Sequence, residues 1–330
     1  MAIDTPACSI IIRAFNEEEH IGRLLTGIMQ QTVQPAEIIL VDSGSTDATV
    51  AIASRFPVKV VHIRPEDFTF GYSLNQGIAQ ASSEIIVMAS AHVYPVYPDW
   101  LERLLRPFEN EKVALSYGKQ RGLPSSDFSE NQIFVSWFPD TSSFRQGTPF
   151  CNNANAAIRK SLWQQHAYDE SLPGLEDLAW AQWAKDQGYE IAYVAEAEII
   201  HVHQQNPKGI YNRYLREAMA FKRIYPQAVF GLREFLKLWI SNTLVDLNEA
   251  RKYGKLKKTW RSIMSFRWNQ FRGTYRGYRQ SGDLTWTLKQ AFYYPGNGIN
   301  KPAEQKRDLA PISYTENPVH LHMREEEKAE

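Results

Sequence analysis

The sequence predicts an α/β fold in which a mostly parallel sheet is covered by helices on both faces. Over residues 7–108, apolar runs of strand length alternate with amphipathic runs of helix length. The strand runs are almost continuously apolar, which is typical of parallel strands buried on both faces. The chain has 330 residues, of which 43% are hydrophobic. It is therefore long enough for a large core, and a mostly disordered chain is excluded.

The first two expected elements are a strand over residues 7–15 and a helix over residues 17–31. The strand reads "ACSIIIRAF" and is apolar along most of its length. In the helix, apolar residues recur at helical spacing, namely Ile21, Leu24, Leu25 and Ile28. Acidic residues fill the first turn of this helix, where the helix dipole favours them.

The alternation continues with three further strands and three further helices. We expect the strands over 36–43, 58–63 and 84–90, and the helices over 45–56, 71–82 and 97–108. After residue 119 the pattern loosens, and a stretch rich in Ser, Pro and Gly predicts a mobile loop over 119–134. Beyond it we expect a helix over 174–190, a pair of short strands over 191–203, helices from about 208, and a frayed end over 300–330.

The net charge of zero conceals an uneven distribution along the chain. Residues 1–207 hold 14 Lys and Arg against 25 Asp and Glu, whereas residues 208–280 hold 17 against 4. A strongly basic segment that follows an acidic half indicates an anionic surface as its partner, or else a solvated helix face.

Cysteine content and apolar runs indicate the compartment. Cys8 and Cys151 are the two cysteines, too few for a disulfide framework. The N-terminus lacks the pattern of a signal peptide, and no apolar run approaches the ~20 residues that span a bilayer. We therefore expect a cytoplasmic protein.

Polar residues follow three of the predicted strands. They are Asn16-Glu17, Asp42-Ser43-Gly44 and Ser90-Ala91-His92. Open α/β sheets bind their ligands at the carboxyl ends of the strands. These three clusters therefore predict the binding site.

The segment "SIIIRAFNEEEHIGRLLTGIMQQTVQPAEIILVDSGSTDAT" resembles the opening of family 2 glycosyltransferases. The likeness extends in order over residues 8–205, with "EIIVMASAHVYPVYPDWLERLL", "FCNNANAAIRKSLW" and "GLEDLAWAQWAKDQGY" at the intervals of that family. "IIHVHQQNPKGIYNRY" further resembles bacterial rhamnosyltransferase-like members. The resemblance implies a GT-A fold and an inverting transfer of a sugar from a nucleotide-sugar donor. The acceptor would be a hydroxyl of a saccharide or a lipid-linked saccharide in surface polysaccharide synthesis.

The resemblance also implies which residues hold the donor. Asp42, beside Ser43, would accept hydrogen bonds from the base or ribose, and Glu17 would lie near the ribose. The backbone at Arg13 and Ala14 would flank the base, and the turn Ser90-Ala91-His92 would face the phosphates. For Asp42, a helix cap for the segment that follows is the structural alternative.

A pair of acids at 176–177 carries the expected chemistry. An inverting transfer needs a general base beside the acceptor hydroxyl. By resemblance Asp177 is that base and Glu176 a positioning residue. Two acids that only stabilise a helix dipole are the alternative. The polar run Asn152, Asn153 and Asn155 is expected to line the sugar or acceptor pocket.

The family's D-x-D metal motif reads Ser90-Ala91-His92 in this chain. Two readings stay open. Either His92 and His203 hold a softer metal such as Mn²⁺, because imidazole suits Mg²⁺ poorly, or no metal binds and cationic groups steady the leaving phosphate. We favour a weakened or absent metal requirement. The family's arginine in the third helix is also missing from "SLNQG" (73–77), so UDP, dTDP, GDP and CMP donors all stay open.

The basic segment 208–280 interleaves Arg and Lys with Trp, Tyr and Phe. This composition suits helices that lie on an anionic membrane. The resemblance implies acceptors on lipid carriers, so we expect the protein to bind the inner face of the cytoplasmic membrane. No RNA-binding motif is present, so we expect no nucleic-acid partner. A helical cap that forms a homodimer is the alternative.

Two units follow: a catalytic nucleotide-sugar-binding domain at 1–207 and a basic, aromatic-rich helical extension at 208–330. Because the D-x-D motif is altered, a non-catalytic nucleotide-sugar-binding or scaffold protein of the same family stays open. A nucleotidyltransferase would need a Gly-rich, basic phosphate loop after the first strand. "RAFNEEEH" is acidic instead.

Overall fold

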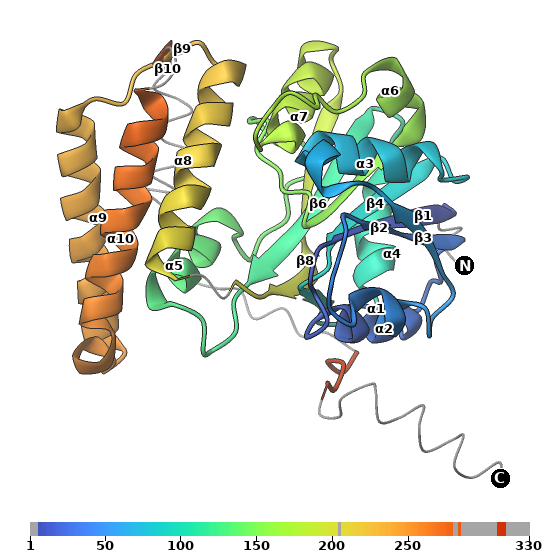
Figure 1. Ribbon diagram of the computed structural model, residues 1–330, viewed down its shortest axis with the longest axis horizontal. Coiled ribbons are helices and arrows are strands. Elements are labelled where there is room, and N and C mark those ends of the chain that lie inside the picture. The colour runs from blue at the N-terminus through green and yellow to red at the C-terminus, as the bar shows by residue number, and fades with distance from the viewer. Residues whose placement is uncertain (1–5, 204–205, 280–282, 285–308, 315–330) are drawn as a thin grey trace.

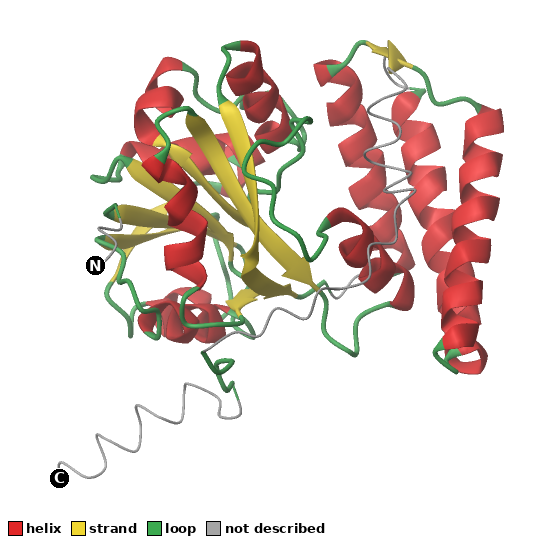
Figure 2. Cartoon of the chain, turned by 180° about the vertical axis from the view of Figure 1, so that it is seen from behind, coloured by secondary structure: helices red, strands yellow, loops and turns green. Residues whose placement is uncertain are grey.

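The computed structural model describes residues 6–203, 206–279, 283–284 and 309–314. Its centre is an eight-stranded mixed sheet with the strand order β3-β2-β1-β4-β7-β6-β8-β5. Helices cover both faces of the sheet, and three long helices stand beside it (Figure 1 and Figure 2). The predicted α/β class with a helical C-terminal extension is confirmed.

One half of the sheet is parallel. Its strands are β1 (Cys8–Ala14), β2 (Glu37–Asp42), β3 (Val58–His62) and β4 (Ile85–Ser90). β1 pairs in parallel with both β2 and β4, and β2 pairs in parallel with β3. The connecting elements are α1 (Ile21–Met29), α2 (Thr49–Ala53), η1 (Pro65–Asp67) and α3 (Phe70–Ala79). Each predicted strand and helix of this half is present, and the helices are shorter than expected.

The other half of the sheet mixes directions. β7 (Asn155–Arg159) runs antiparallel between β4 and β6 (Val113–Arg121). β8 (Glu190–His201) is parallel to β6, and β5 (Val93–Pro95) is antiparallel to β8. The helices of this half are α4 (Trp100–Leu105), η2 (Arg106–Glu109), α5 (Phe128–Trp137), α6 (Lys160–Gln165) and α7 (Glu176–Asp186).

The core consists of one apolar cluster on each face of the sheet. Alternate residues of a strand point to opposite faces. Accordingly Ile10 and Ile12 of β1 belong to the cluster under α1 and α4, whereas Ile11 belongs to the cluster under α3 and α7. All three side chains are fully buried. This two-sided burial explains why the strand sequences are continuously apolar.

Two sequence-based predictions were wrong in this region. Within the stretch 119–134 the loop is limited to residues 122–127, because β6 continues to Arg121 and α5 begins at Phe128. The Asp127 side chain caps α5 by accepting a hydrogen bond from the Ser129 backbone, a start signal hidden among Ser and Pro residues. The stretch 191–203 does not form two strands either. It continues β8, one strand of 12 residues, whose apolar pattern is interrupted by Glu196 and Glu198.

The predicted C-terminal helices are α8 (Pro207–Ile224), α9 (Leu232–Lys252) and α10 (Leu256–Tyr278). They stand side by side with α10 in the middle and α8 nearest the sheet (Figure 1). Gly277 lets α10 approach α8 closely, since a Cβ there would lie 2.5 Å from the Leu215 carbonyl oxygen. A small ladder joins β9 (Gln227–Ala228) to β10 (Asp283–Leu284).

The predicted frayed end over 300–330 lies outside the described residues except for 309–314. There the backbone N–H of Ile312 donates to the Val96 carbonyl. Among the described helices, none combines the length and apolar character that crossing a bilayer requires.

Candidate active site

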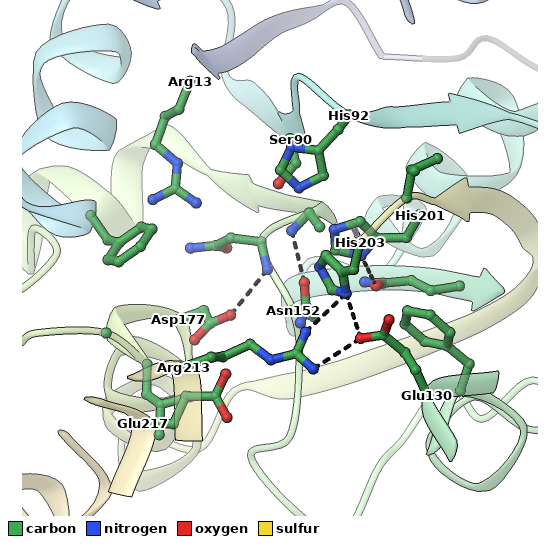
Figure 3. Close-up of a pocket in the computed structure, with 18 of the residues that line it drawn as sticks. Arg13, Ser90, His92, Glu130, Asn152, Asp177, His201, His203, Arg213 and Glu217 are labelled. Atoms are coloured by element: carbon green, nitrogen blue, oxygen red, sulfur yellow. Dashed lines mark hydrogen bonds and ion pairs between the residues drawn. The ribbon is translucent and has the colours of Figure 1, made fainter. Parts of the chain in front are cut away.

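A cavity of about 530 Å³ opens where the carboxyl ends of β1 and β4 meet helices α5, α7 and α8. Figure 3 shows that its labelled side chains converge from both sides of the cavity. Arg13 and Ser90 lie at the carboxyl ends of strands β1 and β4, and His92 lies in the turn between β4 and β5. Arg213 and Glu217 come from α8. The site is therefore built jointly by the sheet and by the C-terminal helices.

The acids Glu176 and Asp177 form the first turn of α7 and line this cavity. Leu175, directly before them, adopts a left-handed backbone with φ 56°. This conformation costs a non-glycine residue roughly 1–3 kcal/mol and is concentrated at functional sites. The tight turn points the first turn of α7 into the cavity.

Asp177 is held firmly and is electrostatically perturbed. Its two carboxylate oxygens accept hydrogen bonds from the backbone N–H groups of Asn153, at 3.0 Å, and Leu178, at 2.8 Å. Burial in the protein, reinforced by the neighbouring charge of Glu176, raises the pKa of Asp177 to about 7. A carboxyl group with this pKa can accept and release a proton at neutral pH.

Glu176 is held from two sides. Its carboxylate accepts a hydrogen bond from the Asn153 side chain at 3.3 Å and lies 3.6 Å from a guanidinium nitrogen of Arg13. That same nitrogen of Arg13 is buried and makes no hydrogen bond. Arg13 also lies over the ring of Phe70, 4.8 Å from its centroid. Arg13 thus keeps an unsatisfied donor at the cavity wall.

Three histidines gather at the other side of the cavity, namely His92, His201 and His203 (Figure 3). The strand pairing places them together. β5 pairs antiparallel with β8 so that Val93 lies opposite His201, and the Val202 N–H donates to the His92 carbonyl. Each imidazole offers a nitrogen within 4.8 Å of those of the other two.

Each histidine places its Nδ1 against an oxygen. His92 Nδ1 lies 2.7 Å from Glu17, His201 Nδ1 lies 2.7 Å from Gln120, and His203 Nδ1 lies 2.8 Å from Glu130. In the tautomer that donates from Nδ1 to these oxygens, every Nε2 keeps a free lone pair. Metal-ligating histidines have this arrangement of a ligating nitrogen backed by an oxygen acceptor.

The electrostatics of the cluster also fit a metal ion. Burial lowers the pKa of both His201 and His203 well below the usual value. These imidazoles are therefore neutral at neutral pH, which is the ligating form. The Nε2 of His201 is buried without a hydrogen-bond partner. A buried orphan acceptor of this kind is explained by an ion that it would ligate.

Arg213 of α8 closes the histidine side of the cavity. Its guanidinium donates to Glu130 of α5 at 2.9 Å and lies 2.9 Å from Nδ1 of His203. The tautomer of His203 decides whether Arg213 or Glu130 is the partner of that nitrogen. This network joins the extension to the sheet.

Sequence reasoning missed His201, Gln120, Glu130 and Arg213. The "HVH" spacing could have indicated His201, since alternate strand residues share a face. Glu130 and Gln120 lie in the stretch that was predicted to be a loop. Arg213 was counted only as part of the basic segment.

The structure brings some of the predicted donor-binding residues to the cavity wall and leaves others away from it. Arg13, Glu17, Ser90 and His92 line the cavity, whereas Ala14, Asp42, Ser43 and Ala91 do not.

The carboxylate of Asp42 is buried and accepts hydrogen bonds from the backbone N–H groups of Gly44 and Ser45, at 3.2 and 3.2 Å. Asp42 therefore shapes the turn that follows β2. It does not cap α2, whose N-cap residue is Ala48.

Of the three asparagines that were predicted to line the sugar or acceptor pocket, two lie at the cavity and one does not. Asn152 and Asn153 line the cavity, but Asn155 lies in the core. The Asn155 side chain accepts a hydrogen bond from Trp100 and donates to the carbonyl oxygens of Lys119 and Ala197. These three partners satisfy its amide, so Asn155 holds strands together rather than contacting a ligand.

Comparison with known proteins finds a family and several relatives. Residues 9–166 match the model of the family described as Glycosyl transferase family 2. The O-antigen chain rhamnosyltransferase WbaN of Salmonella anatum is 29% identical over 223 residues, which cover 63% of this chain and 70% of WbaN. RfbN of Salmonella typhimurium, also an O-antigen chain rhamnosyltransferase, is 27% identical over 220 residues, covering 62% and 69% of the two chains.

Solved structures share the fold at low sequence identity. The mannosyltransferase PcManGT from Pyrobaculum calidifontis, in complex with GDP-Man and Mn²⁺, matches with a TM-score of 0.58 and 18% identity, covering 81% of this chain and 86% of that one. TarS 1–349 of S. aureus in complex with UDP matches with a TM-score of 0.50 and 16% identity, covering 82% and 91%.

Proposed function

The chain belongs to glycosyl transferase family 2 and has the GT-A fold, and we propose that it is an inverting transferase acting in surface polysaccharide synthesis. It takes a sugar from a nucleotide-sugar donor and moves it to a hydroxyl group of a saccharide or lipid-linked saccharide. The observation that carries this proposal is Asp177, a buried carboxyl group whose pKa is raised to about 7 at the wall of a large polar cavity.

Asp177 acts as the general base. The acceptor oxygen attacks the anomeric carbon of the donor sugar while its proton passes to the Asp177 carboxylate. The bond between the anomeric carbon and the phosphate oxygen breaks, and the nucleotide leaves with that electron pair. Attack from the face opposite the leaving group inverts the anomeric centre. Glu176 and Arg13 position the transferred sugar from the same side of the cavity.

The altered D-x-D motif favours a weakened or absent metal requirement, but the cluster of three histidines supports the other interpretation: His92, His201 and His203 would hold a divalent metal ion beside the leaving phosphates. When bound, the ion neutralises charge that develops on the leaving group. Three imidazole nitrogens favour Mn²⁺, Zn²⁺ or another first-row transition metal over Mg²⁺, which prefers oxygen ligands. PcManGT binds GDP-Man with Mn²⁺, in keeping with such an ion. Glu17, Gln120 and Glu130 orient the three rings.

The remaining predicted donor contacts, at Ala14, Asp42, Ser43 and Ala91, would lie with the base and ribose outside this cavity. Asn152 and Asn153 would contact the sugars. The division into a catalytic domain at 1–207 and an extension at 208–330 is kept as a proposal, with α8 supplying part of the cavity wall.

The outer helices of the extension would lie on an anionic bilayer at the inner face of the cytoplasmic membrane. Exposed apolar residues recur every fourth position along α9, at Leu232, Leu236, Ile240 and Leu244, and along α10, at Trp260, Met264 and Trp268. The Trp268 ring packs 5.1 Å from that of Trp239 on α9, so this end of the α10 row lies against α9. We call this set the outer face.

Basic residues alternate with the outer face along both helices, at Arg233, Lys237, Lys257 and Arg261. The few acids are paired. Asp246 is buried against Arg267, Glu249 contacts Lys252, and Glu234 accepts from the Gly231 N–H. Apolar and basic groups together suit the headgroup region of anionic lipids.

The deciding experiment compares the wild type with Asp177→Asn. The wild type is expected to hydrolyse or transfer from one nucleotide sugar in a panel of UDP, dTDP, GDP and CMP donors. Asp177→Asn is expected to lose at least about 100-fold in rate, the usual contribution of a general base, while nucleotide binding in a thermal-shift assay persists. A wild-type protein that binds nucleotides but turns over none of the donors would point to the non-catalytic alternative.

A further inference from the structure

A small side pocket adjoins the main cavity at Asp177. Its volume is about 80 Å³, and Asn152, Asp177 and Glu217 belong to the walls of both spaces. One water molecule needs roughly 10–15 Å³ of such volume. The side pocket therefore has room for a group of a few heavy atoms but not for a second sugar ring.

The walls of the side pocket are mostly apolar. Trp137, Phe150, Leu178, Ala218 and Phe221 line it. They come from α5, the segment before β7, α7 and α8, so the pocket exists only because the C-terminal helices pack against the sheet half of the chain.

The polar residues Asn152, Asp177, Tyr214 and Glu217 line the main cavity as well, so they lie where the two spaces meet. Gln270 and Thr274 are the polar residues that line the side pocket alone. Gln270 accepts a hydrogen bond from Arg267 through its side-chain oxygen, and the Thr274 hydroxyl donates to the Gln270 carbonyl. A hydroxyl group placed in the pocket would lose its water with few partners to replace it, which is unfavourable. A methyl group would gain free energy from the same burial.

The location of the pocket identifies which substrate reaches it. The base Asp177 must touch the acceptor hydroxyl, so a space that opens beside its carboxylate receives a neighbouring substituent of the acceptor sugar. We propose that the side pocket binds a methyl-bearing substituent of that sugar, either the C-methyl of a 6-deoxyhexose or the methyl of an acetamido group. This inference rests on the proposed function, because it takes Asp177 as the base.

Saturation-transfer NMR titrations test the proposal with the full chain and whichever of UDP, dTDP, GDP and CMP stabilises it in the thermal-shift assay. The probes are a free hexose, its 6-deoxy analogue and its 2-acetamido analogue. One methyl-bearing sugar is expected to bind about 10-fold more tightly than the plain hexose, at the lower end of the discrimination that an apolar pocket makes for one small substituent. The two methyl-bearing probes separate the two sources of the methyl group.

Ala218→Val narrows the pocket and is expected to abolish this preference while leaving the affinities for the plain hexose and the nucleotide unchanged. Ala228→Val is the matched control. Ala228 is buried in the same apolar cluster but does not line the pocket, so this variant should keep the preference. Phe150→Leu widens the pocket and should admit a propionamido sugar that the wild type rejects, which provides an independent test if Ala218→Val does not fold.

Equal affinity for the three wild-type probes would overturn the inference, as would a preference that survives Ala218→Val. A wild type that neither binds nucleotides nor turns over any donor would instead overturn the proposed function. The two failures are therefore distinguishable.

Discussion

At the scale of the residue, the chemistry depends on a carboxyl group whose affinity for protons differs from that of an ordinary aspartate. Burial raises the pKa of Asp177 to about 7, so the basic form is only partly populated at neutral pH. The transfer rate is therefore expected to rise with pH and to level off above about 7, with a tenfold loss per pH unit well below it. A pH profile of kcat/KM measures this dependence. A rate that is flat between pH 5 and 8 would contradict the role of Asp177.

The same pKa makes a prediction about stability. Because the folded-state pKa lies above the unfolded one, the folded protein binds this proton more tightly, and the group costs stability as the pH rises from about 4 to about 7. Asp177→Asn removes that cost. Thermal unfolding measures the Tm of both proteins. The Tm gain of Asp177→Asn over the wild type is expected to be larger at pH 8 than at pH 5. A gain that does not depend on pH would contradict the raised pKa of Asp177.

The three histidines make a second prediction at this scale. Calorimetry is expected to show tighter binding of Mn²⁺ or Zn²⁺ than of Mg²⁺. Gln120→Leu removes the oxygen behind His201 and should weaken the preferred metal by about 10–100-fold. His166→Ala is the control, since His166 stacks on Trp183 at 4.6 Å and does not line the cavity. Tightest binding of Mg²⁺ would refute a histidine-held site.

At the scale of the element, the outer face predicts membrane binding by α9 and α10. Full-length protein is expected to co-sediment with vesicles rich in phosphatidylglycerol and less with pure phosphatidylcholine, and salt should weaken the binding. The variant that carries Leu236→Gln, Ile240→Gln and Trp268→Gln should no longer co-sediment with these vesicles. Phe144→Gln removes an equally exposed apolar residue away from these helices, so this variant should still bind the vesicles. If the triple variant instead separates a dimer that never bound vesicles, the face is an interface between two copies.

At the scale of the whole molecule, a buried ion pair links the extension to the sheet half. Arg213 of α8 and Glu130 of α5 expose 12% and 6% of their side chains. Removing one partner of such a pair leaves the other charge buried without a counter-charge. Glu130→Ala and Arg213→Ala should therefore each lower the free energy of unfolding by about 3–5 kcal/mol. The double variant should cost less than the sum, as urea denaturation can measure.

Arg145→Ala provides the comparison for this pair. Arg145 contacts Glu190 with 84% of its own side chain exposed, and breaking an exposed pair should change stability by less than about 1 kcal/mol. Similar losses for the exposed and buried pairs would show that the Glu130–Arg213 pair does not hold the two halves together.

By itself, the sequence determined the parallel half of the sheet, the family and the acid pair. Continuous apolar runs and their spacing encode strands and helices locally, and the motif order is specific. The tertiary structure alone decided which polar residues share a cavity. Pairing of β5 with β8 places His201 beside His92, and packing of α8 places Arg213 against Glu130. The side chains of Asn155 and Asp42 instead form hydrogen bonds with backbone groups. These contacts join residues far apart in the chain, so no local pattern records them.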